Sequence, residues 1–355
     1  MDSKFSDDMT MEILSRTSLN TLDALRCTSK QFGTLTYDPY FLNLYKQNNK
    51  IVSGFLVLKG RKGCDYTNEF APAPESTTLD LGFLPHASKI LASSEQGLIV
   101  LESPHPRVST FVCYHVCKPA TKQILALPNP KTKYMTETVA MVVMSSKPLH
   151  YKIIRFSKTR PDNKYVEYTT YRCEIFDSRT WAWRLLDLVR LPSYFSPSDK
   201  HPIITRGSIY MLLQNKEVFK FDAYSEKWTT FSSPIQTLDY DLHVPAAARK
   251  LVKYQGKLGF ACQTPSLRSW EIWVLTLDKS WEQLQVVDMK EVRLKSLEAI
   301  YDSNTRVAWE QTTLVFYKFK GDDCISEFQM FQGGYFPCRT FAFRSDFEPA
   351  DLRGR

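Results

Sequence analysis

Two patterns of apolar positions divide the chain near residue 50. Between residues 5 and 47, apolar side chains recur every three or four positions, as at Met9 and Ile13, which predicts short amphipathic helices. After residue 50 they fall instead in short runs separated by turn residues, for example residues 55–58 and 208–213. Such runs at close spacing predict the strands of a sandwich, a barrel or a propeller.

The helical part predicts three helices. Ser6 can cap the first, and Ser18 or Asn20 can cap the second, for which Gly33 is the expected stop. Asp38 is the expected cap of the third, because a proline follows it at the first helical position. A segment of about forty residues makes a poor independent core. Part of its apolar surface is therefore expected to face a partner.

A turn motif repeats in the strand-rich part. An aspartate is followed by a hydroxyl residue and then by a tryptophan in Asp177/Thr180/Trp183 and Asp222/Ser225/Trp228, and Asp278/Trp281 is a shortened copy. In an earlier copy, Thr121 and Ile124 take the hydroxyl and tryptophan positions. The carboxylate can accept backbone N–H bonds in the turn, and the ring can cover the preceding sheet. Because the copies lie 59, 45 and 53 residues apart, residues 51–345 predict a propeller of about six four-stranded blades.

Composition and charge support a division into two parts. Aromatic residues make up 13% of the chain, which suits strands that pack large rings. The net charge of +8 is uneven, because residues 1–47 hold five basic against six acidic side chains and the remainder carries the excess. Eight scattered cysteines predict free thiols in a reducing compartment. No signal peptide or membrane-spanning stretch is evident, so we expect a cytoplasmic or nuclear protein without a membrane partner.

The helical segment resembles the F-box, the adaptor-binding motif of ubiquitin-ligase substrate receptors, especially in its plant form. The matching positions are Asp7, Asp8, Glu12, Ile13, Leu14, Arg16, Leu22, Leu25, Arg26, Cys27, Ser29, Lys30, Asp38, Pro39, Phe41 and Leu44. The rest of the chain is similar to the F-box-associated, kelch-like domain of plant F-box proteins. This likeness includes ASSEQGLIVL at residues 92–101, the turn at residues 118–121 and a Phe/Tyr-rich closing section. The predicted fold is mainly β, with a three-helix F-box at 1–47, a propeller at 51–345 and a tail at 346–355.

The resemblance implies a substrate-recognition subunit of an SCF-type (Skp–cullin–F-box) ubiquitin ligase, without catalytic residues or a cofactor. The F-box would dock on a Skp-type adaptor, and through it on a cullin, while the propeller would bind a target protein that the sequence does not identify. The expected apolar adaptor contacts are Ile13, Leu14, Leu19, Leu22, Leu25, Cys27 and Pro39, with Arg26 and Lys30 at the polar rim. Some of these side chains must instead hold the helices together, and the sequence does not separate the two groups.

Two other hypotheses remain open. The family has Leu-Pro where this chain has Phe5-Ser6 and Thr17-Ser18, so the propeller could be a binding module whose degenerate F-box acts outside ubiquitination. The second is a nucleic-acid binder, less favoured than a solvated hairpin loop or a loop that recognises an acidic partner. It rests on a basic run of Lys147, Lys152, Arg155, Lys158, Arg160 and Lys164.

A metal site and a catalytic site are not expected. Cys113, His115 and Cys117 alternate and would share one face of a strand. Successive residues on that face lie about 6.6–6.8 Å apart, too far for all three to bind one tetrahedral zinc ion. The sequence also lacks the spaced His, Ser or Gly motifs of common hydrolases and nucleotide-binding enzymes.

Overall fold

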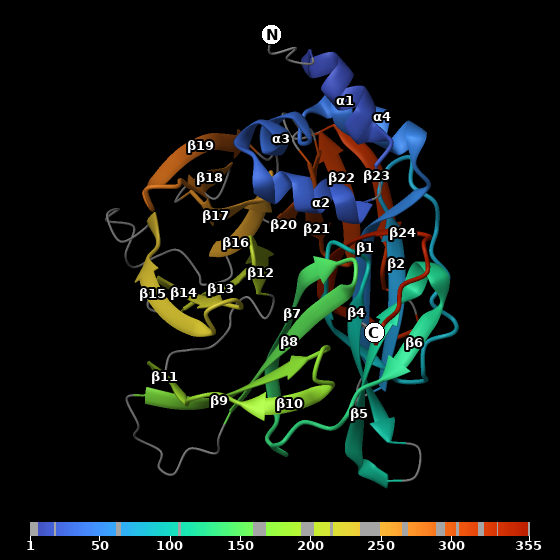
Figure 1. Ribbon diagram of the computed structural model, residues 1–355, viewed down its shortest axis with the longest axis vertical. Helices are drawn as coiled ribbons and strands as arrows, with labels where there is room; N and C mark the ends of the chain where they lie inside the picture. Colours follow the sequence, from blue (N-terminus) through green and yellow to red (C-terminus); the bar gives the residue numbers. More distant parts are fainter. Residues whose placement is uncertain are drawn as a thin grey trace.

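Four helices precede a ring of six sheets in the computed structural model of the protein (Figure 1). The structure describes residues 6–17, 19–61, 65–105, 108–158, 168–192, 202–213, 216–234, 249–264, 269–288, 295–302, 305–318, 323–331 and 333–353. Within these ranges, no helix is long and apolar enough to cross a membrane.

The N-terminal segment forms four helices rather than three. They are α1 (Asp7–Ser15), α2 (Leu19–Thr28), α3 (Lys30–Leu35) and α4 (Pro39–Asn48). The second predicted helix is divided at Ser29, whose hydroxyl accepts a bond from the Gln31 N–H and so caps a new helix. Gly33 lies inside α3 and is not the stop that we expected.

The predicted caps at the two ends of this segment are confirmed. The Ser6 hydroxyl accepts from Met9 N–H at 3.2 Å, and the Asp38 carboxylate accepts from Tyr40 N–H at 2.8 Å. Of the two predicted caps for α2, Asn20 lies inside the helix, whereas Ser18 is outside the described residues. Thus local hydrogen bonding explains where α1, α3 and α4 begin.

The six sheets are the blades of a propeller, as predicted, but among the described residues two of them have three and five strands and not the expected four. Blade 1 joins the two ends of the chain and has the order β2–β1–β24. Its strands are β1 (Ile51–Arg61), β2 (Asp65–Pro72) and β24 (Phe336–Asp346). Because β24 pairs antiparallel with β1 along its whole length, the last strand closes the ring against the first.

The other five blades follow one another in sequence, each built from antiparallel neighbours. Blade 2 contains β3 (Lys89–Ser93), β4 (Ile99–His105), β5 (Val108–Lys118) and β6 (Gln123–Ala126), with a short 3-10 helix η1 (Pro119–Thr121) before β6. Blade 3 contains β7 (Thr136–Ser146), β8 (Leu149–Lys158), β9 (Tyr168–Asp177), β10 (Ala182–Leu185) and β11 (Val189–Pro192). Both β10 and β11 pair with β9, so the outermost strand of blade 3 is divided.

The remaining blades have four strands each. Blade 4 contains β12 (Ile203–Thr205), β13 (Ser208–Leu212), β14 (Glu217–Asp222) and β15 (Lys227–Ser232). Blade 5 contains β16 (Arg249–Tyr254), β17 (Lys257–Gln263), β18 (Ser269–Leu275) and β19 (Trp281–Asp288). Blade 6 contains β20 (Lys295–Ile300), β21 (Thr305–Glu310), β22 (Thr313–Lys318) and β23 (Cys324–Gln329).

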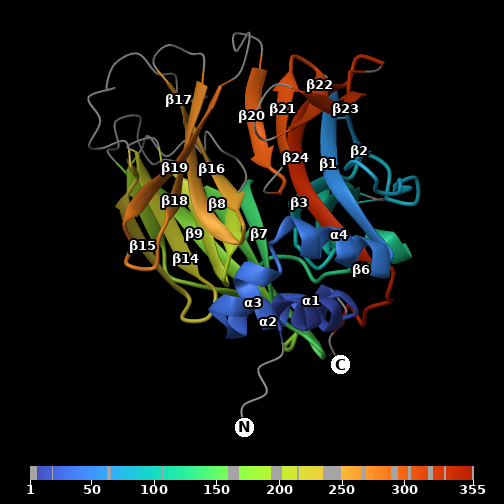
Figure 2. The same ribbon diagram turned by 90° about the horizontal axis from the view of Figure 1, so that it is seen from above.

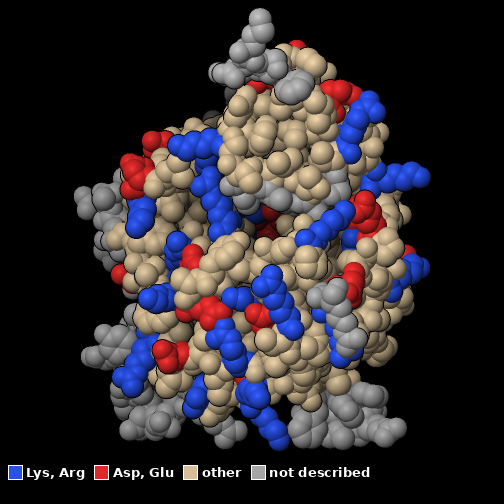
Figure 3. Space-filling view, viewed as in Figure 1, with Lys and Arg blue, Asp and Glu red and all other residues tan. Residues whose placement is uncertain are grey.

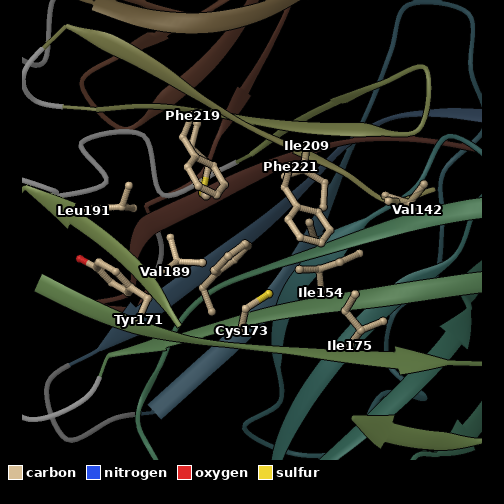
Figure 4. Packing of buried hydrophobic residues seen from close by; sticks show 14 of the residues in the cluster. Val142, Ile154, Tyr171, Cys173, Ile175, Val189, Leu191, Ile209, Phe219 and Phe221 are labelled. Carbon is tan, nitrogen blue, oxygen red and sulfur yellow. The ribbon is translucent and has the colours of Figure 1, made fainter. Parts of the chain in front are cut away.

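Buried apolar clusters fill all six interfaces between neighbouring blades. The largest cluster joins blades 3 and 4, and Figure 4 shows its side chains converging from both sheets. There the Phe156 ring meets Phe219 and Phe221 edge-on at centroid distances of 5.8 and 6.1 Å. Aromatic pairs in this geometry add to the gain from burial, which gives the high aromatic content a structural role.

The repeated motif forms the turn between the third and fourth strands of its blade. The Asp222 carboxylate accepts from the backbone N–H groups of Tyr224 and Ser225 at 3.0 and 2.8 Å. The Asp177 carboxylate likewise accepts from Arg179 N–H at 2.9 Å. In every copy, the residue two positions before the tryptophan position has a positive φ, namely Lys122, Trp181, Glu226 and Lys279. No glycine marks these left-handed positions, so the sequence alone did not predict them.

The hydroxyl position of the motif does not make the same contact in each copy. The Ser225 hydroxyl donates to the Asp222 carboxylate at 3.1 Å. The Thr180 hydroxyl is exposed and donates instead to the backbone carbonyl of Asp177 at 3.4 Å. The Asp177 carboxylate is also shared with the His150 ring, whose Nε2 lies 3.0 Å from it. Thr180 is therefore a weak part of its turn.

Two of the three tryptophans cover the preceding blade as expected. The Trp183 indole donates to the Pro128 carbonyl at 2.7 Å and packs in the cluster between blades 2 and 3. The Trp281 indole, which follows the shortened Asp278 turn, donates to the Ser232 carbonyl of blade 4 at 2.9 Å. Trp228 differs, because it stacks on Phe219 of its own blade and remains 39% exposed.

The Asp222 turn predicts a local pH dependence of stability. Partial burial raises the pKa of Asp222, but the hydrogen bonds from Ser225 and Tyr224 outweigh it, so its pKa lies below the usual 3.8. This carboxylate therefore stabilises the fold above that value, and the contribution is lost as the pH falls through the lower folded-state pKa. In thermal unfolding, we expect Asp222→Asn to be less stable than wild type at pH 7, and the difference between the two proteins to shrink as the pH falls below 3.8. A gap that widens on acidification would contradict this assignment.

Candidate functional site

The helices lie together on one face of the propeller, as Figure 2 shows. The contact is close at Tyr37, since a Cβ atom added to Gly256 in the β16–β17 turn would come within 2.5 Å of the Tyr37 hydroxyl oxygen. Gly256 also has a φ of +70°, so glycine is favoured there for two reasons. Ile51 at the start of β1 packs against the helical core and joins it to the propeller.

The outer surface of this helical segment carries exposed apolar side chains. Met9 and Ile13 lie one turn apart on α1 and are 53% and 54% exposed, and Tyr40 at the start of α4 is 63% exposed. Helices α1 and α4 are neighbours. We call these three residues the head patch. Large apolar side chains that are exposed on two neighbouring helices are typical of a protein-docking surface.

The structure separates the predicted adaptor residues into two groups. Leu14 and Leu22 are buried with Phe41 and Tyr45 and form the core of the helical segment, and Leu25 packs against them. Ile13 is exposed in the head patch, and Lys30 is exposed at the start of α3. The side chains of Leu19, Cys27 and Pro39 are outside the described residues. Met9 and Tyr40 were not predicted, although the four-residue spacing of Met9 and Ile13 was a signal for a shared face.

The Arg26 side chain contacts other residues of this chain and does not lie at the rim of the helical surface, where it was expected. Its guanidinium donates to the Thr36 hydroxyl at 3.1 Å and to the Thr36 carbonyl at 2.9 Å, and it lies 4.2 Å from the centre of the Tyr37 ring. It therefore holds the segment after α3 that contacts the Gly256 turn. We assign Arg26 a positioning role between the helices and the propeller.

A cavity of about 2510 Å³ lies between this helical segment and the centre of the propeller. Side chains from α2, α3 and all six blades line it, and Figure 3 shows the central hollow with basic side chains around it. Glu95 and Lys253 form an ion pair at 2.6 Å, and Lys250 pairs with Glu298 at 2.9 Å. Half-buried aromatic rings from Phe231, among others, lie in its wall.

The predicted basic patch at residues 147–164 is not a continuous surface. Strand β8 is buried along most of its length, so Lys152 and Arg155 are buried and bind Glu226 and Glu174 respectively. Lys147 and Lys158 are exposed but lie at opposite ends of this strand, whereas Arg160 and Lys164 are outside the described residues. Within the described residues, only isolated members of the set reach solvent, which removes the main argument for nucleic-acid binding at this place.

The cysteine and histidine side chains do not form a reactive centre in the described part of the chain. Cys113, His115 and Cys117 lie on β5 as predicted, and Cys117 is buried in the cluster between blades 1 and 2. Burial raises the pKa of the Cys117 thiol to about 12. Among the described residues, no three His, Cys, Asp or Glu side chains are placed to hold one metal ion.

Comparison with known proteins agrees with this architecture. Residues 72–323 match the model of a family described as the F-box associated beta propeller domain. The F-box protein At5g41720 of Arabidopsis thaliana is 28% identical over 170 residues, which cover 45% of this chain and 89% of the relative. The putative F-box protein At5g52610 of the same plant is 24% identical over 302 residues. These residues cover 81% of this chain and 79% of that relative.

A solved structure with a similar outline is the periplasmic gluconolactonase PpgL of Pseudomonas aeruginosa. The alignment covers 82% of this chain and 99% of the gluconolactonase chain, with a TM-score of 0.45 and 10% sequence identity. A likeness of this size carries no argument about activity.

Proposed function

Because the chain belongs to the family of plant F-box proteins that carry an F-box-associated β-propeller domain, we propose that it is the substrate-recognition subunit of an SCF-type ubiquitin ligase. Residues 1–47 act as the F-box that docks on a Skp-type adaptor and through it on a cullin. The propeller, predicted at residues 51–345 and extended by Asp346 at the end of β24, binds the target protein. The tail that follows packs on the propeller, with Leu352 buried in the cluster between blades 2 and 3. This role is carried out in the cytoplasm or nucleus, which the free thiols of cysteines such as Cys113 and Cys338 support.

The observation that carries the proposal is the head patch of Met9, Ile13 and Tyr40. Each side chain leaves more than half of its surface in water, although Leu14 and Phe41 on the same two helices are buried. Transferring such groups into an interface is favourable by roughly 25 cal/mol per Å² of apolar surface. The patch therefore supplies apolar adaptor contacts without disturbing the helical core.

No catalytic group is required of this chain. A receptor that binds the adaptor at one end and a target at the other raises the effective concentration of the target near the conjugating enzyme. The F-box departure at Thr17 is compatible with this role. Its hydroxyl donates to the Leu14 carbonyl at 2.7 Å, and its carbonyl accepts from the Tyr45 hydroxyl at 3.0 Å, so α1 ends in satisfied hydrogen bonds.

The test is co-purification of the tagged full-length chain with a Skp-type adaptor. We expect Ile13→Asp to reduce adaptor capture by about thirty-fold, because a charge in an apolar contact costs roughly 2 kcal/mol or more. The matched control is Leu188→Asp, since Leu188 is also exposed but lies in blade 3 between β10 and β11. Leu25→Asp is unsuitable, because Leu25 packs in the helical core.

Two outcomes would overturn the proposal. Wild-type protein that is folded and captures no adaptor would favour the propeller as a binding module with a degenerate F-box. Equal capture by wild type and Ile13→Asp would show that the head patch is not the docking surface.

A further inference from the structure

Five basic side chains converge on the cavity beneath the helices. Lys30 belongs to α3, Lys147 to the β7–β8 turn, Arg206 to the β12–β13 turn and Lys279 to the β18–β19 turn, and Lys257 begins β17 directly after the β16–β17 turn. All five are exposed and line the cavity. None of them forms an ion pair with a carboxylate in the described ranges. In an antiparallel blade, the turn between the first and second strands and the turn between the third and fourth strands lie on the same face. Blades 3, 4 and 5 therefore direct the charges on their turns to the same opening.

The acidic side chains of the lining are already engaged. The cavity is lined by nine basic and four acidic residues. Asp38 caps α4, Asp222 closes its own turn, Glu95 pairs with Lys253 and Glu298 pairs with Lys250. The five exposed bases named above therefore have no carboxylate partner among the described residues. A concave surface lined by one sign of charge concentrates the field and attracts a ligand of the opposite sign.

Apolar groups at the same opening favour a peptide over a phosphate-rich ligand. Tyr224 and Leu277 line the cavity and are 63% and 64% exposed, next to the partly buried rings of Phe231 and Trp281. The cavity is also larger than the roughly 300–1,000 Å³ of a small-molecule site. Acidic side chains alternating with apolar ones fit this lining.

We propose that the opening between α3 and the inner turns of blades 3, 4 and 5 binds an acidic peptide segment of a partner protein. The carboxylates of that segment meet Lys30, Lys147, Arg206, Lys257 and Lys279, and its apolar side chains contact Tyr224 and Leu277. This inference rests on the proposed function only in identifying the partner as the target. It places the bound segment on the same face of the propeller as the helices.

The inference is tested with a fluorescein-labelled peptide of alternating Glu and Phe and the purified full-length chain, by fluorescence polarisation at 50 and 300 mM salt. We expect saturable binding that weakens at the higher salt concentration, because exposed charges are screened. The variant Arg206→Glu/Lys257→Glu should bind at least tenfold more weakly. The control Lys131→Glu/Lys158→Glu changes the net charge equally at exposed residues that do not line the cavity, and it should stay within twofold of wild type.

Three results would overturn the inference. They are absence of peptide binding at 50 mM salt, an equal loss in both double variants, and tighter binding of inorganic polyphosphate or single-stranded DNA than of the peptide at the same site. Adaptor capture is measured separately on the same protein preparation. A chain that captures the adaptor without binding the peptide contradicts this inference alone, and a chain that binds the peptide without capturing the adaptor contradicts the proposed function alone.

Discussion

Replacing Trp183 with alanine is expected to lower the free energy of unfolding by about 3–5 kcal/mol, the usual cost of removing a large buried ring. The Trp183 side chain is 3% exposed and packs against Tyr114 of blade 2 and Phe176 of its own blade, with ring centroids 6.2 and 5.5 Å away. The variant also leaves the Pro128 carbonyl without its indole donor. Urea unfolding followed by tryptophan fluorescence and circular dichroism measures the loss.

The matched control for this variant is Trp228→Ala. Trp228 occupies the same position of the repeated turn in the next blade, but it is 39% exposed and stacks on Phe219 without covering the preceding blade. Removing the Trp228 ring should therefore lower the free energy of unfolding much less than removing the Trp183 ring. Equal losses in the two variants would show that the indole contributes through the turn itself and not through contact with the neighbouring blade.

Breaking the buried ion pair of blade 3 is expected to lower the free energy of unfolding by a similar amount. Arg155 on β8 and Glu174 on β9 are directly opposed, and their side chains are 3% and 0% exposed. Glu174 also accepts from the Thr132 N–H and hydroxyl at 2.9 and 2.8 Å. Since removing one partner leaves a buried charge uncompensated, Glu174→Leu should cost about 3–5 kcal/mol.

A double-mutant cycle separates the pair from its surroundings. The variant Arg155→Met/Glu174→Leu removes both charges, and we expect it to cost less than the sum of the two single changes. Urea unfolding of the four proteins gives the coupling free energy. Additive losses would mean that the two charges do not stabilise each other in the folded protein.

The repeated turn was the part of the fold that the sequence predicted best. The aspartate and tryptophan positions identify the turn between the third and fourth strands, because local hydrogen bonding and a returning ring act within a few residues of chain. The spacing of the copies then predicts the number of blades. That Trp228 stays on its own blade, and that the Thr180 hydroxyl does not reach the Asp177 carboxylate, could not be predicted in this way. The position of Trp228 depends on the Phe219 ring of the neighbouring strand.

Residues whose burial depends on distant partners were predicted less well. Lys152 and Arg155 were read as surface charges because charged side chains are usually solvated. Each is instead buried beside a carboxylate from another strand, Glu226 and Glu174. Likewise Leu14 and Ile13 are neighbours on one predicted helix, and only the packing of α4 distinguishes the buried leucine from the exposed isoleucine.

The most direct test of the proposed receptor role is calorimetric titration of the purified full-length chain with a purified Skp-type adaptor. The proposal predicts one adaptor bound per chain in the wild type, much weaker binding for Ile13→Asp, and unchanged binding for Leu188→Asp. Folding of each protein is verified by circular dichroism before the titration. No binding by folded wild-type protein would contradict the assignment of this chain as an adaptor-docked substrate receptor.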